Sequence, residues 1–219
     1  MEAERTGLFC AGILCYTYIK SVHRAQGEEP TMQKVTIDVI VDMQNDFVTG
    51  ALGTAEARAM SGRLAAEARR AAGAGHALFF TLDTHEADYL STREGKKLPV
   101  EHCLRGTEGW NLVPEVAAVA EEADPACPAK VLVEKPTFGA SELPAAVHKF
   151  LTETGTDVEK FRVYGVCTDI CVISNAMLLR AFFPETPIEI LAGLCAGVCP
   201  ESHETALKAM GACQFDVVG

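Results

Sequence analysis

Six short apolar segments alternate with helical stretches between residues 34 and 218, and this alternation limits the possible folds more than any other feature. Short apolar strands that are each followed by a helix are typical of a parallel sheet with both faces covered. The sequence therefore predicts a doubly wound α/β fold, with a six-stranded parallel sheet and helices on both faces. The predicted strands are 34–42, 76–83, 129–135, 161–166, 187–192 and 213–218, and the predicted helices are 54–72, 111–122, 141–153, 169–182 and 200–210.

The first 31 residues do not follow this pattern. They contain an apolar run, LFCAGILCYTYI (8–19), which is too short to span a bilayer. The leader before it carries two acidic residues and one Arg, which is the wrong charge for a signal peptide, and no clear cleavage site follows. We therefore expect residues 1–31 to be a loose extension outside the fold and residues 32–219 to form one domain.

Composition argues against several classes of partner and site. The 30 acidic residues exceed the 19 basic residues by 11, whereas nucleic acids and anionic membranes bind basic surfaces. The nine cysteines are an odd number and no two have CxxC spacing, which argues against a disulfide scaffold, a zinc ribbon or a thioredoxin-type dithiol. We expect no nucleic-acid or membrane partner, reduced thiols and a cytoplasmic location.

Four side chains capable of chemistry fall at or just after the ends of successive predicted strands. Asp42 ends the first strand, Asp83 the second and Lys135 the third, and Cys171 follows the fourth. Ligands of open α/β sheets bind beyond the carboxyl ends of the strands, so these side chains are expected to share one site. Taken singly, an Asp after a strand is usually a turn residue and a Lys there is usually solvated. Their joint placement favours a catalytic site.

Cys171 is the candidate nucleophile. Thr168 or Asp169 can cap the predicted helix that follows, which puts the thiol in its first turn. There the helix dipole favours the thiolate, and a nearby Lys135 acts in the same direction, so we expect a lowered thiol pKa. The backbone N–H groups of Cys171 and Cys167 could bind an oxyanion. The alternative is a buried cysteine that acts as a small hydrophobic residue, or one exposed by chance, and we assign this to Cys10, Cys15, Cys103, Cys127, Cys195, Cys199 and Cys213.

The charged loop after the second predicted strand contains a second group of candidates. Asp83 and His85 lie two residues apart, which puts both side chains on one side of an extended segment, and His102 follows after 16 intervening residues. With Glu94 as a possible fourth partner, these residues make a mixed O/N site for one divalent metal ion, zinc, with iron or manganese as alternatives. Two histidines in a charged loop are otherwise more often solvated.

Five motifs occur in the order found in a known family: VDMQNDF (41–47), DTH (83–85), EHC with the following RGT (101–107), EKPTFGA (134–140) and GVCTDICV (165–172). On these motifs the chain resembles the isochorismatase-like cysteine hydrolases, and the nicotinamidases in particular, over about residues 34–217. The resemblance implies a six-stranded α/β sandwich that forms a cysteine hydrolase domain, here residues 32–219. Relatives that hydrolyse isochorismate lack the cysteine, so its presence implies hydrolysis of a carbon–nitrogen bond.

The resemblance also implies the roles of individual residues. The catalytic triad would be Asp42, Lys135 and Cys171, with an oxyanion hole formed by the backbone N–H groups of Cys167 and Cys171 and a cis peptide bond before Cys167. The metal ligands would be Asp83, His85 and His102.

The chain departs from the nicotinamidases at Pro99, three residues before the last metal histidine. In those relatives an aromatic residue at this position often packs against the pyridine ring. Phe47, Tyr89 and Phe138 are the candidate walls of the substrate pocket here, although aromatic residues at such spacing are more often core residues.

Three functions remain open at this point. The leading hypothesis is a metal-dependent cysteine amidohydrolase of NAD metabolism, which converts nicotinamide to nicotinate and ammonia through a thioester on Cys171. The second is a related hydrolase of another small amide, ureide or N-carbamoyl compound. The third is a thiol redox or metal-binding module that uses Cys167 and Cys171. Asp42 and Lys135 favour hydrolysis, because a redox pair needs neither. The sequence leaves open whether the chain forms a homo-oligomer.

Overall fold

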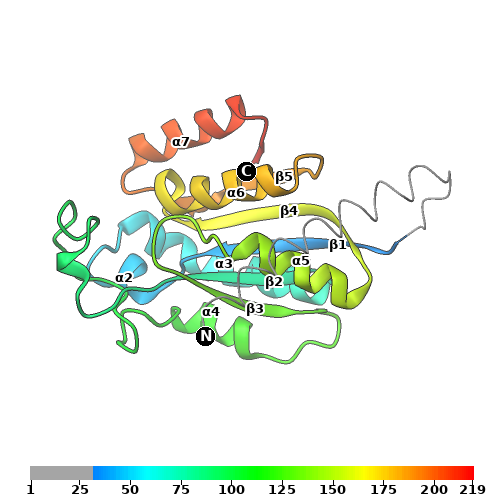
Figure 1. The fold of residues 1–219 in the computed structure, drawn as a ribbon, viewed down its shortest axis with the longest axis horizontal. Helices are drawn as coiled ribbons and strands as arrows, with labels where there is room; N and C mark the ends of the chain where they lie inside the picture. Colours follow the sequence, from blue (N-terminus) through cyan, green and yellow to red (C-terminus); the bar gives the residue numbers. More distant parts are fainter. Residues whose placement is uncertain (1–31) are drawn as a thin grey trace, which may run out of the picture.

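The computed structural model describes residues 32–219, and the predicted extension 1–31 lies outside the described residues. Six parallel strands form one sheet in the order β3-β2-β1-β4-β5-β6 (Figure 1). This confirms the predicted doubly wound α/β fold. The strands are β1 (Lys34–Val41), β2 (Ala77–Asp83), β3 (Lys130–Lys135), β4 (Asp157–Val166), β5 (Ile188–Ala196) and β6 (Asp216–Val218).

The helical elements agree with the predicted pattern except at two places. The predicted helix 169–182 is divided, because its first part is a π-helical turn, η2, and the α-helix starts only at Ile173. The two shortest elements, α2 and η1, were not predicted, because they are too short to show a helical period. The elements are α2 (Asn45–Val48), α3 (Ala55–Gly73), η1 (Tyr89–Ser91), α4 (Pro114–Glu121), α5 (Leu143–Thr154), η2 (Thr168–Val172), α6 (Ile173–Phe182) and α7 (Pro200–Ala212).

Three strand boundaries also differ from the predicted ones. Strand β4 starts at Asp157 and pairs with β1 from there, although its first residues are polar. Strand β5 continues beyond residue 192 to Ala196. Strand β6 is shorter than predicted because α7 continues to Ala212. None of these differences moves a predicted site residue off its strand end.

Helices cover both faces of the sheet. Arg162 on β4 forms an ion pair with Glu67 of α3, which places α3 on one face. On the opposite face the Phe79 ring of β2 packs against Phe150 of α5 at 6.0 Å between centroids. Figure 1 shows α5 in front of the sheet and α3 behind it. The central strands β1 and β2 are therefore buried on both sides, which explains their nearly continuous apolar sequences.

The strand order reverses between β1 and β4, and a crevice is expected at such a point, outside the carboxyl ends of the strands. Gly165 of β4 lies beside Val41 of β1, with a φ of 132°. A Cβ atom at Gly165 would lie 2.1 Å from the carbonyl oxygen of Val41. Only glycine therefore allows β4 to approach the end of β1 this closely, directly next to Asp42.

Within residues 32–219, no helix is long and apolar enough to cross a membrane. The seven cysteines in this part of the chain are all free thiols, as predicted. Cys199 and Cys213 are exposed, and the other five are buried or half-buried.

A buried polar network lies under α3, in the middle of the sheet. The Asp38 carboxylate is fully buried and accepts hydrogen bonds from Arg162 Nη1 at 3.0 Å and from the Tyr164 hydroxyl at 2.8 Å. His76 Nδ1 lies 2.8 Å from the other Asp38 oxygen. A buried carboxylate of this kind is tolerated only when its partners are present.

We predict that Arg162→Met destabilises the protein by about 3 to 5 kcal/mol, because it leaves Asp38 buried without its cationic partner. The measurement is the free energy of unfolding from urea titration. Arg69→Met is the matched control, because it breaks an ion pair with Glu122 that is about half exposed on both sides, and should cost about 0 to 1 kcal/mol. Equal small losses in the two variants would contradict the prediction.

Candidate active site

The ammonium group of Lys135 is the centre of the site. Its Nζ lies 2.8 Å from Asp42 Oδ2, 2.9 Å from Asp83 Oδ1 and 3.6 Å from the Cys171 sulfur. All four side chains are buried. The structure therefore brings together the four side chains that the sequence analysis placed at successive strand ends.

Backbone pairing and one hydroxyl group hold these side chains in place. Asp83 and Lys135 are register partners at the ends of β2 and β3, so their side chains leave the sheet at the same level. Asp42 follows β1 with a φ of 49°, a conformation that Asp tolerates better than most residues. Its Oδ1 accepts a 2.6 Å hydrogen bond from the hydroxyl of Thr81, a residue that the sequence analysis did not identify.

Cys171 lies in the π-helical turn η2 and not in the first turn of a capped α-helix. The predicted N-cap is wrong, because both candidate side chains bind elsewhere. The Thr168 hydroxyl lies 2.8 Å from His203 Nδ1, and Asp169 Oδ1 accepts from the N–H of Val198 at 3.1 Å. These contacts attach η2 to α7 and to the loop before it.

The backbone around the nucleophile turn has two further features. The peptide bond between Val166 and Cys167 is cis, as the resemblance implied. The Cys167 carbonyl oxygen accepts hydrogen bonds from the backbone N–H groups of Ile170 and Val172. The N–H of Cys171 lies between these two donors in the sequence and does not bind this carbonyl. Asn175, which the sequence analysis also missed, donates from Nδ2 to the Cys171 carbonyl at 2.8 Å.

The electrostatics of the thiol differ from the prediction. Burial raises the pKa of the Cys171 thiol, the Asp42 carboxylate raises it further, and Lys135 opposes both without overcoming them. The predicted lowering of this pKa is therefore wrong. Burial lowers the pKa of Lys135, but Asp42, Cys171 and Asp83 together raise it well above its usual value. For Asp42, burial raises the pKa more than Lys135 lowers it. These directions favour an ammonium group at Lys135 and a protonated thiol at Cys171.

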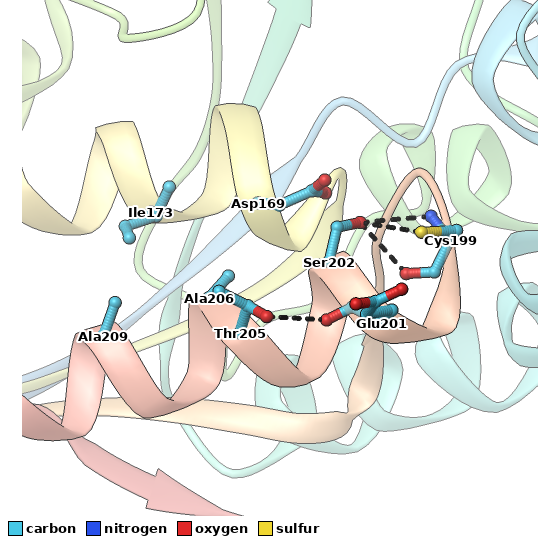
Figure 2. A pocket seen from close by; sticks show the side chains of 8 residues that line it. All are labelled: Asp169, Ile173, Cys199, Glu201, Ser202, Thr205, Ala206 and Ala209. Carbon is cyan, nitrogen blue, oxygen red and sulfur yellow. Dashed lines mark hydrogen bonds between the residues drawn. The ribbon is translucent and has the colours of Figure 1, made fainter.

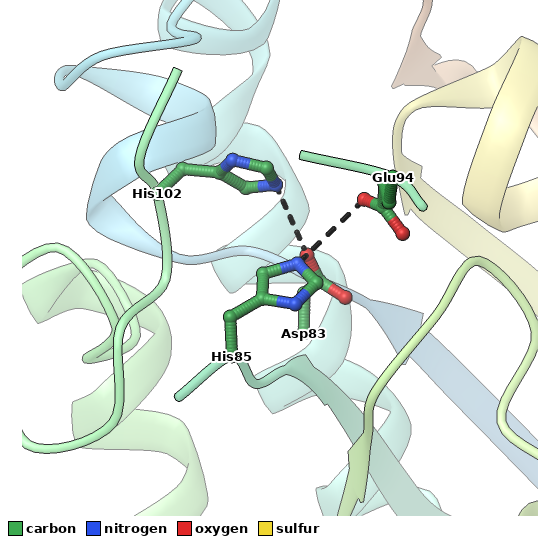
Figure 3. Close-up of side chains that lie close together, drawn as sticks. All are labelled: Asp83, His85, Glu94 and His102. Atoms are coloured by element: carbon green, nitrogen blue, oxygen red, sulfur yellow. Dashed lines mark hydrogen bonds and ion pairs between the residues drawn. The ribbon is translucent and has the colours of Figure 1, made fainter. Parts of the chain in front are cut away.

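The predicted metal ligands also lie together (Figure 3). Four side chains each offer one ligand atom, and these atoms all lie within 4.8 Å of one another. The four residues are Asp83, His85, Glu94 and His102. His85 Nε2 is 3.0 Å and His102 Nε2 3.4 Å from Asp83 Oδ2, and His85 Nε2 is 3.7 Å from Glu94 Oε1. Two imidazoles and two carboxylates form a donor set suited to zinc, iron or manganese.

Second contacts orient two of these ligands. His102 Nδ1 lies 2.8 Å from the Val100 carbonyl, which leaves Nε2 directed at the group. Burial raises the pKa of Asp83, but hydrogen bonds from His102 and His85 and the charge of Lys135 bring it below its usual value, so the carboxylate stays ionised. The residues present therefore fit a divalent cation.

The three candidate pocket residues occupy different positions. Phe47 packs edge-on against His102 at 5.5 Å, and the fully buried Tyr89 ring lies 4.5 Å from that of His85. Phe138, in the loop after β3, is exposed. Pro99 is exposed as well. Phe47 and Tyr89 thus pack against the predicted metal ligands and are buried, whereas Phe138 is exposed.

A hollow lies between η2, the start of α6 and α7 (Figure 2). It contains none of the predicted catalytic or metal-binding side chains. Its residues include Asp169, Ile173, Ala206 and the exposed Cys199. Hydrogen bonding with Ser202 lowers the pKa of the Cys199 thiol, which is exposed, whereas Cys171 is buried.

Comparisons with known proteins identify similar chains of nearly the same extent. Residues 36–218 match the isochorismatase domain family. The nicotinamidase/pyrazinamidase of Bacillus subtilis is 25% identical, with a TM-score of 0.71 over 84% of this chain and 100% of that one. The pyrazinamidase of Pyrococcus horikoshii, solved in complex with zinc, is 24% identical, with a TM-score of 0.67 over 84% of this chain and 98% of that one.

A third solved structure, the N-carbamoylsarcosine amidase of Thermoplasma acidophilum, is 19% identical, with a TM-score of 0.60 over 84% of this chain and 95% of that one. No curated protein sequence is significantly similar to this chain.

We predict that alkylation of Cys171 by iodoacetamide is slow near pH 7 and accelerates as the pH rises, because the thiolate reacts and the thiol pKa is raised. Asp42→Asn removes a negative charge that raises this pKa, so labelling should be faster at any fixed pH, by roughly tenfold for each unit of pKa. Peptide mass spectrometry separates Cys171 from Cys199, which should be labelled first.

Asp38→Asn is the control, because it removes a buried carboxylate from β1, the strand that Asp42 follows, but outside the site. It should leave the labelling rate of Cys171 unchanged. Labelling of Cys171 before Cys199 at pH 7, or an unchanged rate in Asp42→Asn, would contradict the electrostatic account.

Proposed function

The chain belongs to the isochorismatase family of hydrolases, and we propose that it is a metal-dependent cysteine amidohydrolase that converts nicotinamide to nicotinate and ammonia. The observation that carries the proposal is the triple contact of Lys135 with Asp42, Asp83 and Cys171. A nucleophile, a proton acceptor and a fixed positive charge then lie within reach of one carbonyl group. As part of the same proposal, the enzyme acts in NAD metabolism in the cytoplasm.

In the first step the Cys171 sulfur attacks the carboxamide carbon. The carbon–sulfur bond forms, the thiol proton passes to Asp42, and the carbonyl electron pair moves to the oxygen. The backbone N–H groups of Cys167 and Cys171 receive this oxyanion. A buried Asp42 with a raised pKa is able to hold the proton until it is needed.

Collapse of the tetrahedral adduct re-forms the carbonyl group and breaks the carbon–nitrogen bond. Asp42 delivers its proton to the departing nitrogen, which leaves as ammonia and yields a thioester on Cys171. Water then attacks the thioester carbon with Asp42 as the base, and nicotinate and the free thiol result. Throughout, Lys135 keeps its charge and holds the Asp42 carboxylate beside the sulfur.

One divalent metal ion, zinc in our proposal with iron or manganese as alternatives, would be held by Asp83, His85 and His102, with Glu94 as a further ligand. When bound, the ion supplies a positive charge that attracts the ring nitrogen of the substrate. Phe47 and Tyr89 support the two histidines, and they form the pocket walls together with Phe138.

The second candidate is a hydrolase of another small amide, ureide or N-carbamoyl compound. The observation that favours it is Pro99, which is exposed at the position where the resemblance calls for an aromatic partner of a pyridine ring. A thiol redox module is less consistent with the site, because burial raises the thiol pKa of both Cys167, to about 12, and Cys171. Homo-oligomer formation stays a prediction.

We predict that the purified protein releases ammonia from nicotinamide faster than from aliphatic amides, ureides or N-carbamoyl amino acids. Cys171→Ala should abolish release, because the nucleophile is lost. Cys167→Ala is the matched control and should retain most of the activity, because a backbone N–H survives a change of side chain. Ammonia is measured over the whole panel of substrates.

The outcomes separate the candidates. A large preference for another amide or ureide would replace nicotinamide and keep the hydrolase. Equal loss of activity in Cys171→Ala and Cys167→Ala, or a disulfide between them in freshly isolated protein, would favour the redox function.

We predict about one divalent ion per chain from the ligand count, and a strong loss of bound metal in His102→Ala. The KM for the substrate should rise because the ring nitrogen loses its partner, and this effect should exceed the damage to folding. Metal content by elemental analysis is the direct measurement. His148→Ala, on α5 and outside the metal group, is the control. Full occupancy in His102→Ala would show that other residues bind the metal.

A further inference from the structure

The side-chain amide of Gln44 makes an unusual set of contacts behind the metal group. Gln44 is fully buried, and its Oε1 accepts a 2.8 Å hydrogen bond from the backbone N–H of Asp83. Its Nε2 donates to the backbone carbonyls of Asp83 and Trp110, at 2.8 Å each. One side chain thus satisfies both backbone groups of the residue shared by Lys135 and the metal group.

The end of β1 explains why this amide is needed. The last register pair of β1 and β2 is Val41 with Thr81, and the Asp42 N–H still reaches the Thr81 carbonyl at 3.2 Å. The chain then turns away at Asp42. Two residues further along β2, the backbone N–H and C=O groups of Asp83 point to the same side of β2 as those of Thr81. Strand β1 has already ended there and offers no partner. Buried N–H and C=O groups require partners, and the Gln44 amide supplies both, as a peptide group of β1 would.

Fixing the Asp83 backbone also fixes its carboxylate. On the other side of β2, Asp83 is the register partner of Lys135. Held from both sides, the carboxylate directs Oδ1 to Lys135 at 2.9 Å and Oδ2 to His85 and His102 at 3.0 and 3.4 Å. A rotation of this peptide unit would draw Oδ2 away from the histidines.

The third hydrogen bond of Gln44 extends this effect to the loop that follows His102. Trp110 is bound through its carbonyl to Gln44 Nε2, and its indole N–H donates to the Thr84 hydroxyl at 2.8 Å. Gln44 also forms a backbone bridge with Leu112. The amide therefore ties the strand that carries Asp83 to the segment that leads back to His102.

We propose that Gln44 is a positioning residue, whose amide holds Asp83 and the segment after His102 in the arrangement that binds the divalent metal. The proposal rests on the proposed function for the metal, but its test is independent of amide hydrolysis. Gln44→Met keeps the size of the side chain and removes all three hydrogen bonds. Gln44→Asn keeps the amide but is one methylene too short to make all of them, and it serves if the Met variant does not fold.

The measurement is the affinity for Co²⁺ together with the visible absorption spectrum of the bound ion, which reports the geometry of its ligands. Loss of a residue that orients a metal ligand usually weakens binding roughly 10- to 100-fold, and we expect a loss of this size with a changed spectrum. Saturating Co²⁺ should restore part of the lost turnover. Tyr164→Phe is the matched control, because it removes one buried hydrogen bond of the same sheet outside the site. It should lower the unfolding midpoint and leave Co²⁺ affinity and spectrum unchanged.

Unchanged Co²⁺ affinity and spectrum in a folded Gln44 variant would overturn the proposal, and so would a wild-type protein that binds no Co²⁺. Weaker binding with an altered spectrum supports it even if the wild type releases no ammonia from any amide. In that case only the proposed reaction fails.

Discussion

The buried ammonium of Lys135 is the interaction on which the arrangement of the site depends. An isolated charge in the protein interior is too unfavourable to persist, so the fold must bring compensating charges to it. Asp83 does so from the end of the neighbouring strand β2, at 2.9 Å, and Asp42 from the end of β1, one strand further along the sheet, at 2.8 Å. The common level at which β1, β2 and β3 end is therefore a requirement of the chemistry as much as of the sheet. Any shift in register would separate the ammonium from its partners.

Several polar side chains outside the proposed triad maintain this arrangement. Thr81 holds the carboxylate of Asp42, Gln44 holds the backbone of Asp83, and Asn175 holds the carbonyl of Cys171. Gln44 and Asn175 each bind backbone groups at places where a strand ends or a helix departs from regular geometry. The irregular backbone of the site is thus supported by the regular sheet below it.

The sequence predicted the fold and the grouping of the site residues, because both follow from apolar periodicity and from the rule that strand ends converge. It did not predict the π-helical turn that contains Cys171. Thr168 and Asp169 are good N-cap residues by type, but their side chains bind His203 and Val198, more than 25 positions away in the sequence. The expected lowering of the Cys171 thiol pKa was wrong because this pKa, too, depends on groups that are distant in the sequence. It depends on burial and on the nearby Asp42 carboxylate, and neither can be read from the position of Cys171 in a helix. Gln44 was missed because its partners are backbone groups, which leave no sequence pattern.

The carboxylate of Asp83 has one oxygen on Lys135 and the other on the two histidines. A metal ion held by this group would therefore share a carboxylate with the lysine that lies beside the thiol. A substitution among the metal ligands would also change the electric field at the Cys171 sulfur. A substitution of Lys135 would change the negative charge that Asp83 presents to a metal ion. Substitutions of Asp83 on β2 and of Lys135 on β3 are therefore coupled through this one carboxylate.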